Sequence, residues 1–201
     1  MISKNQKISL PILSDKNVSL YIKREDLLHP FISGNKYRKL KYNLIAAQQK
    51  GHDTVLTFGG AFSNHIAATA FAGHEKGLHT IGIIRGEELT HKWETNPTLK
   101  FAHENGMQFK FVTREAYRNK TNEIFLNALT SEFGPHYLLP EGGTNHEAAR
   151  GCEEILTFED AHFNVICSSV GTGGTIAGIS NATHEKQLVL GFLALKGDSR
   201  L

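Results

Sequence analysis

Cysteine is scarce in this chain of 201 residues, and its two cysteines, Cys152 and Cys167, form no C-x-x-C pair. A disulfide framework or a zinc site built on cysteines therefore has little support. The eleven histidines include no H-E-x-x-H motif or similarly spaced pair, so a metal site is not favoured either. Two reduced thiols are typical of a cytoplasmic protein.

Long apolar runs and a surplus of one charge are also missing. Residues 1–7 are polar, no apolar segment follows them, and no stretch is long enough to span a bilayer. The formal net charge of +2 is too small to indicate a nucleic-acid partner without a clustered basic face. We expect a cytoplasmic protein whose partners include neither a membrane nor a nucleic acid.

Short apolar runs alternate regularly with segments of helical pattern. The runs predict strands at residues 18–23, 55–58, 80–84, 108–112, 137–140, 164–170 and 188–195. The segments between them predict helices at residues 36–49, 63–76, 97–105, 115–133, 145–158 and 176–184. Strands separated by helices of this length indicate an α/β fold, in which open, twisted parallel sheets are covered by helices on both faces.

A glycine-rich loop joins the strand at 164–170 to the next helix, and its residues are Gly171, Thr172, Gly173, Gly174 and Thr175. Free N–H groups and the positive dipole end at a helix N-terminus attract an anion, and glycines let the backbone approach it closely. The loop therefore predicts a phosphate site. The alternative is a tight turn whose glycines serve only positive φ angles. Neither common nucleotide motif matches, because no lysine follows the loop and Ile176 replaces the third glycine of G-x-G-x-x-G.

A second turn of this kind follows the strand at 55–58, where two glycines precede Ser63, Asn64 and His65. Backbone N–H groups at the start of the next helix would hold a carboxylate well. The alternative is that Ser63 or Asn64 only caps its own helix, and that His65 is a structural partner. Two such turns at one edge of a parallel sheet predict a ligand with phosphate-like and carboxylate-like ends, or a cofactor together with a substrate.

Lys36 stands in the first turn of the helix predicted at 36–49, for which Asn35 is the expected N-cap. A helix dipole disfavours an ammonium group at this end, so the neutral amine needed for Schiff-base chemistry is more accessible there. Solvated lysines also occupy such positions, so the position alone does not assign a function.

Together these segments resemble the fold type II (tryptophan-synthase-like) enzymes that depend on pyridoxal 5'-phosphate (PLP). Within them, the chain is similar to the branch of 1-aminocyclopropane-1-carboxylate deaminase and D-cysteine desulfhydrase. The likeness covers about residues 10–197, and four segments carry it: 23–26 with 33–40, the turn at 59–65, residues 140–145 and the loop at 171–175.

The resemblance implies that Lys36 binds the cofactor covalently, that Gly171 to Thr175 bind its phosphate, and that Asn64 hydrogen-bonds its phenolic oxygen. Ser63, Asn64 and His65 would bind the substrate carboxylate, and Lys36 or Ser63 would transfer protons. The implied reaction is the deamination of a small amino acid, D-cysteine or 1-aminocyclopropane-1-carboxylate, to ammonia and a 2-oxo acid. A homodimer is also implied.

The resemblance further implies two domains: residues 1–50 and 140–201 form a larger cofactor-binding domain, and residues 51–139 form a smaller α/β domain inserted in it. Family members continue beyond this length and supply a tyrosine over the substrate and a group facing the pyridine nitrogen, so the expected fold is C-terminally truncated. Two alternatives stay open: a catalytically inactive remnant of the family, and a phosphate-sugar or nucleotide-binding module, which leaves the lysine segment unexplained.

Overall fold

The computed structural model describes residues 1–194, so the last predicted strand residue, 195, and the end of the larger expected domain lie outside it. Its helices and strands run in the order β1 (Asn5–Ile8), α1 (Pro11–Asp15), β2 (Leu20–Lys23), α2 (Asn35–Gln49), β3 (Thr54–Gly60), α3 (Asn64–Lys76), β4 (His79–Arg85), α4 (Pro97–Glu104), β5 (Met107–Val112), α5 (Arg114–Arg118), α6 (Glu123–Phe133), β6 (Tyr137–Leu139), α7 (His146–Glu153), β7 (Val165–Val170), α8 (Gly174–Ala182) and β8 (Leu188–Leu193). None of the helices within this range is long and apolar enough to cross a membrane.

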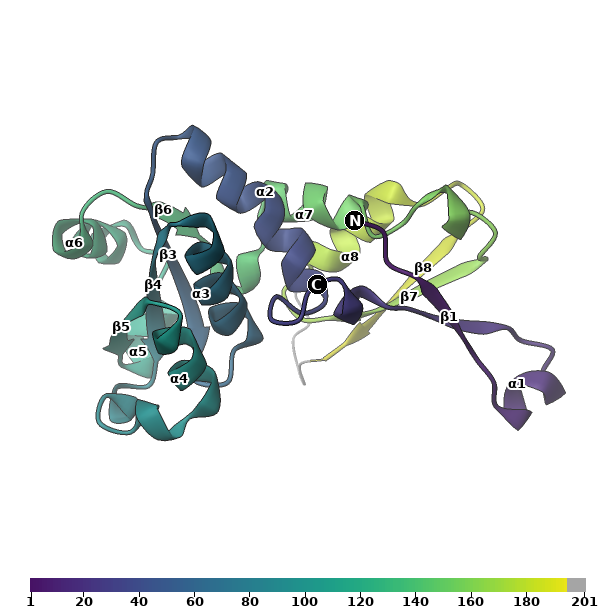
Figure 1. The fold of residues 1–201 in the computed structure, drawn as a ribbon, viewed down its shortest axis with the longest axis horizontal. Coiled ribbons are helices and arrows are strands. Elements are labelled where there is room, and N and C mark those ends of the chain that lie inside the picture. The colour runs from purple at the N-terminus through teal and green to yellow at the C-terminus, as the bar shows by residue number, and fades with distance from the viewer. Residues whose placement is uncertain (195–201) are drawn as a thin grey trace.

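The main sheet has four parallel strands in the order β5-β4-β3-β6. Leu56 and Phe58 of β3 pack toward α5 and α6, whereas Val55 packs toward α2 and α3 on the opposite face. Figure 1 shows this sheet between α3 on one side and α6 on the other. The predicted parallel sheet with helices on both faces is therefore confirmed, and the unbroken apolar runs in β3 and β4 are what two covered faces require.

The second half of the molecule contains two smaller sheets. Strands β7 and β8 form a parallel pair, and β1 and β2 form an antiparallel hairpin. The hairpin is held to the segment before β7 by the carboxylate of Asp160, which accepts from Lys23 Nζ at 2.6 Å and from Asn5 Nδ2 at 2.7 Å. The strand pair and the hairpin lie beyond α7 and α8, away from the main sheet (Figure 1).

Two glycines allow α7 to lie in direct contact with both α2 and α8. A Cβ at Gly151 would be 2.0 Å from the carbonyl oxygen of Arg38 on α2. A Cβ at Gly178 on α8 would be 2.3 Å from the carbonyl oxygen of Ala149. Because α2 begins next to Lys36 and α8 follows the glycine-rich loop, this packing brings the two segments together.

A buried ion pair fixes the start of α2. The Arg38 side chain is 1% exposed and donates to Glu25 through Nε at 2.9 Å and through Nη2 at 3.0 Å. Such a two-point contact sets both the distance and the orientation of its partners. Glu25 follows β2, so the pair ties the hairpin to the helix that carries Lys36.

Several predicted elements differ from the structure. The helix predicted at 115–133 is two helices, α5 and α6, because Asn122 caps α6 by accepting from the N–H of Ile124. The helix predicted at 145–158 ends at Glu153. Strand β1 and helix α1 were not predicted, since their short segments carry no clear apolar period.

We expect Gly178→Ala to destabilise the fold by about 1–3 kcal/mol, because the new methyl group enters space that α7 already fills. Urea unfolding of the purified protein measures the change. The control is Ser180→Ala, an exposed position on the same helix, which should alter stability by less than about 0.5 kcal/mol. Equal effects of the two variants would contradict the packing argument.

Candidate functional site

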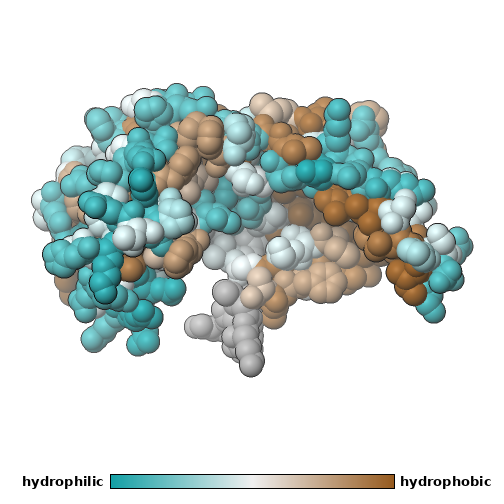
Figure 2. Space-filling model, turned by 60° about the horizontal axis from the view of Figure 1, so that its bottom comes forward, coloured by the Kyte–Doolittle hydropathy of each residue, from teal (hydrophilic) through white to brown (hydrophobic). Residues whose placement is uncertain are grey.

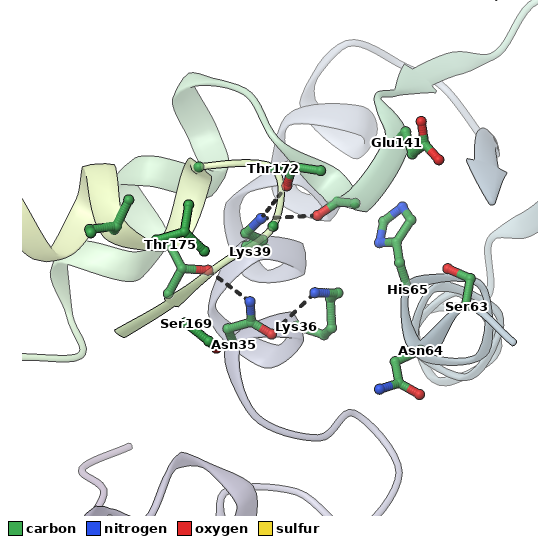
Figure 3. Close-up of a pocket in the computed structure, with 15 residues that line it drawn as sticks. Asn35, Lys36, Lys39, Ser63, Asn64, His65, Glu141, Ser169, Thr172 and Thr175 are labelled. Atoms are coloured by element: carbon green, nitrogen blue, oxygen red, sulfur yellow. Dashed lines mark hydrogen bonds between the residues drawn. The ribbon is translucent and has the colours of Figure 1, made fainter. Parts of the chain in front are cut away.

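A cavity of about 500 Å³ lies where the main sheet meets α2 and α8 (Figure 3). Its wall includes nearly every residue predicted for the site: Lys36, Ser63, Asn64, His65, Gly171, Thr172, Gly173 and Thr175. The remaining predicted residue, Gly174, is the first residue of α8 and is buried behind the loop. The three residues of the second turn lie on one side of the cavity, and Lys36 and Lys39 of α2 lie on the other with the glycine-rich loop (Figure 3).

Lys36 lies in this wall with its amine hydrogen-bonded at 3.1 Å to Oδ1 of the neighbouring Asn35. Burial lowers the pKa of the Lys36 ammonium below its ordinary value. The neutral amine is therefore easier to reach than for a lysine in water, which is a condition for a nucleophilic lysine.

Asn35 does not have the predicted capping role. The N-cap position of α2 belongs to Gly34, whose φ of 60° suits glycine, and Asn35 is the first residue of the helix. Its side-chain amide donates instead to Thr175 Oγ1 at 2.7 Å, while its oxygen accepts from Lys36. The amide therefore links the lysine to the glycine-rich loop.

Lys39 is a site residue that the sequence analysis did not identify. It is 2% exposed, and its Nζ donates to the carbonyl oxygen of Gly142 at 3.1 Å and to Thr144 Oγ1 at 3.0 Å. A third contact, at 3.4 Å, reaches Thr172 Oγ1 in the glycine-rich loop. Lys39 follows Lys36 by three residues, so both lysines lie on one face of the helix. This spacing is the sequence feature that could have identified Lys39.

The surroundings of Lys39 contain acceptors but no charge that would neutralise it. Within residues 1–194, every hydrogen-bond acceptor of its ammonium group is a carbonyl or a hydroxyl oxygen. Burial, and to a smaller extent the nearby charge of Lys36, lowers the pKa of Lys39 to about 8. A buried ammonium beside a helix N-terminus fits an anion such as the phosphate of PLP.

Ser63 takes the N-cap position of α3, as the alternative interpretation of this turn predicted. Its Oγ accepts from the N–H of Ile66 at 3.4 Å, so its own hydroxyl proton is free to donate into the cavity. Asn64, the first residue of the helix, is exposed and lies across the cavity from Lys36 (Figure 3). Gly59 is required behind this turn, because a Cβ there would be 2.4 Å from the Ile66 side chain.

The hydrogen bonds of His65 fix its tautomer. Thr57 Oγ1 donates its only proton to the carbonyl oxygen of Leu139 at 2.9 Å, so its 2.8 Å contact with His65 Nε2 requires the ring to donate. Nδ1 then carries a lone pair, and it has no partner within the described residues. Burial lowers the pKa of His65 to about 3, and the charges of Lys36 and Lys39 act in the same direction.

Glu141 is the carboxylate in the cavity wall, and it belongs to residues 140–145, one of the four segments that carry the resemblance. It accepts from Tyr117 Oη at 2.7 Å and lies 3.1 Å from Lys120 Nζ. Burial and this hydrogen bond raise the pKa of Tyr117, so its proton stays on the phenol. The carboxylate of Glu141 is thereby already neutralised from the side of the main sheet and leaves Lys36 and Lys39 without an anion.

Residues 2–194 match the family of pyridoxal-phosphate-dependent enzymes. A putative 1-aminocyclopropane-1-carboxylate deaminase of Thermotoga maritima is 38% identical over 178 residues, a match that covers 84% of this chain and 55% of that protein. The bifunctional D-cysteine desulfhydrase/1-aminocyclopropane-1-carboxylate deaminase of Arabidopsis thaliana is 35% identical over 176 residues, covering 80% of this chain and 44% of the relative.

A solved structure described as an ACC deaminase homologue has the same fold. It superposes with a TM-score of 0.74 at 32% sequence identity, and the match covers 90% of this chain and 56% of that one. The chain therefore spans about half the length of the curated relatives it matches.

We expect the buried, neutral His65 to make folding stability depend on pH. Because its folded pKa of about 3 lies below the ordinary 6.5, only the unfolded chain binds a proton between these values, and stability falls as the pH drops below 6.5. The wild-type protein should lose about 1–2 kcal/mol between about pH 7.5 and about pH 5 that the His65→Gln variant retains. Urea unfolding at both pH values tests this, and parallel losses in the two proteins would contradict it.

Proposed function

Because the chain belongs to the family of pyridoxal-phosphate-dependent enzymes, we propose that its cavity binds PLP and that the protein deaminates a small amino acid. The products would be ammonia and a 2-oxo acid. The names of the two curated relatives support D-cysteine and 1-aminocyclopropane-1-carboxylate as the first substrates to test. The observation that carries the proposal is a half-buried lysine of lowered pKa that shares one cavity with a glycine-rich helix N-terminus.

The chain's own residues fit the cofactor at both ends. Lys36 would supply the amine that bonds to the cofactor's aldehyde carbon, and Asn64 across the cavity would donate to its phenolic oxygen. The phosphate would lie against the N–H groups of residues 171–175, with Lys39 as its neutralising cation. When bound, PLP supplies an electron sink that stabilises negative charge on the substrate's α-carbon.

The second turn would bind and orient the substrate. Backbone N–H groups at the start of α3 and the free hydroxyl proton of Ser63 would hold the carboxylate. Lys36 is the group best suited to take up and return a proton, because burial lowers its pKa and makes the neutral amine easier to reach. His65 stays neutral at working pH and so would position its neighbours and not act as an acid.

We also propose the two-domain organisation that the sequence predicted. The smaller domain, residues 51–139, would contribute Ser63, Asn64 and His65 to the cavity. The larger domain, residues 1–50 and 140–201, would contribute Lys36 and the glycine-rich loop. The position of the cavity between the main sheet and α2 with α8 supports this division.

The length of the relatives supports a second candidate, a protein that binds PLP but does not turn over substrate. The chain spans only 44–55% of the relatives, so residues that complete their sites are outside the match. Cofactor binding without ammonia release from either amino acid would favour this candidate.

We expect the purified protein to develop a visible absorbance band with PLP that the Lys36→Ala variant lacks, because only a lysine-bound cofactor depends on that amine. Lys100→Ala, an exposed lysine on α4, is the matched control and should retain the band. Ammonia release from D-cysteine and from 1-aminocyclopropane-1-carboxylate is then measured on the same samples. A folded wild-type protein without the band would overturn the proposed function.

Lys39→Met should weaken PLP binding about tenfold or more, because one charged hydrogen-bond donor to the phosphate is lost. The Lys36-dependent band should still form at saturating cofactor. Since the pKa of Lys39 is about 8, wild-type affinity should fall as the pH rises above that value, and the variant's affinity should fall less. Titration of the band against PLP concentration at several pH values measures both effects. Unchanged affinity in Lys39→Met would remove Lys39 from the phosphate site.

A further inference from the structure

His65 is a buried polar side chain with one unpaired nitrogen. Figure 2 shows a mostly hydrophilic surface on the half of the molecule that contains the main sheet, where water supplies the partners of polar groups. His65 belongs to this half but is only 2% exposed, and its Nδ1 has no hydrogen-bond partner within residues 1–194. Buried acceptors are almost always paired in native proteins, so we expect a donor to reach this nitrogen.

The contacts of the imidazole ring fix the direction of the Nδ1 lone pair. Nε2 donates to Thr57 Oγ1 on β3, which holds that edge of the ring against the main sheet. A Cβ at Gly143 would lie 3.5 Å from Nδ1 and 3.7 Å from the Cβ of Lys39 on α2. Figure 3 shows the ring on the side of the cavity that faces both lysines of α2. The lone pair therefore faces the space between the second turn and α2.

Several donors around this space are already used. The ammonium group of Lys39 has three protons and three oxygen acceptors. The N–H of Gly143 donates to the carbonyl oxygen of Pro140 at 2.8 Å. Asn64 is exposed, and its side chain points away from the imidazole (Figure 3). Ser63 is a rival donor, since its hydroxyl proton is free, although its Oγ is held at the start of α3.

Lys36 is the donor with unused N–H groups beside the lone pair. Its ammonium group has three protons, and its hydrogen-bond acceptor within the described part of the chain is Asn35 Oδ1 at 3.1 Å. The amine ends a flexible four-carbon stem, so side-chain rotation alone can move it away from Asn35. The charge of Lys36 also lowers the pKa of His65 more than the charge of Lys39 does, as expected of a near neighbour.

We propose that Nδ1 of His65 is the second acceptor of the Lys36 amine, and that His65 is thereby a positioning residue for the proton transfers of the proposed reaction. The amine rests on Asn35 in the free protein and moves to His65 once a substrate has taken its place at the cofactor. The role in proton transfer rests on the proposed function, whereas the contact between the two side chains does not.

An acceptor at this position suits a lysine that takes up and returns a proton. A neutral amine that donates one N–H to Nδ1 keeps its own lone pair. That lone pair accepts the proton of the substrate, and the electrons of the broken bond stay on the substrate. The resulting ammonium group keeps the same contact with Nδ1 and later returns the proton. Because the imidazole stays neutral, it orients the lysine without becoming charged itself.

Nitrogen-15 NMR of the protein without cofactor tests the contact. The resonance of a histidine ring nitrogen reports whether it carries a proton and whether it accepts a hydrogen bond. The signals of His65 among the eleven histidines are those that His65→Gln removes. We expect an unprotonated Nδ1 in the wild type. In Asn35→Ala its resonance should shift as it does on accepting a hydrogen bond, because the amine then loses its first acceptor. Asn35→Ala combined with Lys36→Met is the matched control and should show no such shift.

Two substitutions of His65 separate the roles of its two nitrogens. The amide of Gln reaches the position of Nε2 and can keep the contact with Thr57, whereas the amide of Asn lies at the position of Nδ1. We expect His65→Gln to lower kcat about tenfold or more, with KM and PLP affinity changed less than about threefold. His65→Asn should have the higher kcat of the two by about threefold or more, although it loses the contact with the main sheet.

Four outcomes would overturn the proposal. A protonated Nδ1 in the wild type would remove the acceptor. The same Nδ1 resonance in folded Asn35→Ala and in its double variant would show that Lys36 does not reach the ring. A resonance that responds to Ser63→Ala instead would assign the donor to Ser63. A higher kcat in His65→Gln than in His65→Asn would limit His65 to its structural bond with Thr57.

The NMR measurement needs neither cofactor nor turnover, so it decides the contact between Lys36 and His65 by itself. Loss of the Lys36-dependent absorbance band would contradict the proposed function and leave the NMR result unaffected. Failure of the positioning proposal and failure of the proposed function are therefore distinguishable.

Discussion

The contact of α7 with α2 and α8 is the constraint on which the site depends. Gly151 receives the carbonyl oxygen of Arg38, and Gly178 lies against the carbonyl oxygen of Ala149, at distances that leave no room for a methyl group. One helix thereby sets the positions of both the lysine segment and the glycine-rich loop. The ion pair of Arg38 with Glu25 fixes the same turn of α2 from its other side. Small errors in this packing would directly change the distance between the Lys36 amine and the glycine-rich loop, because close-packed interiors do not deform smoothly.

The charges of the cavity follow from that geometry. Two lysines on one helix face and a neutral imidazole point toward a common space. The charge of Lys36 lowers the pKa of Lys39, and the charges of both lysines lower the pKa of His65. The carboxylate in the same cavity wall, Glu141, is already neutralised by Tyr117 and Lys120. Burying the two ammonium groups costs free energy when no anion is present. An anion that enters the cavity is therefore stabilised by these charges, which is a general way in which a fold can favour phosphate binding.

The sequence was sufficient for the parallel α/β fold and for most of the cavity wall, because strand periodicity and glycine turns are local signals. It was not sufficient for Lys39, whose three acceptors come from segments about one hundred residues or more along the chain. Nor did it indicate that Asn35 leaves its capping role for a bond to Thr175, 140 positions away. The break between α5 and α6 was missed for a different reason: Asn122 is a good N-cap, but the polar residues that precede it also occur on the exposed face of a continuous helix. Local patterns identify the elements, whereas the choice of hydrogen-bond partners is made by the tertiary structure.

The side-chain amide of Asn35 has one further consequence. Its oxygen accepts from Lys36 and its nitrogen donates to Thr175, so the amide cannot be turned over without losing both bonds. When another group takes the lysine's amine, the oxygen loses its partner, and only the bond to α8 still holds the amide in place. The state of the amine therefore affects the first turn of α8 through a single planar group. In this way the two ends of the cavity are mechanically coupled: occupation of one alters the rigidity of the other.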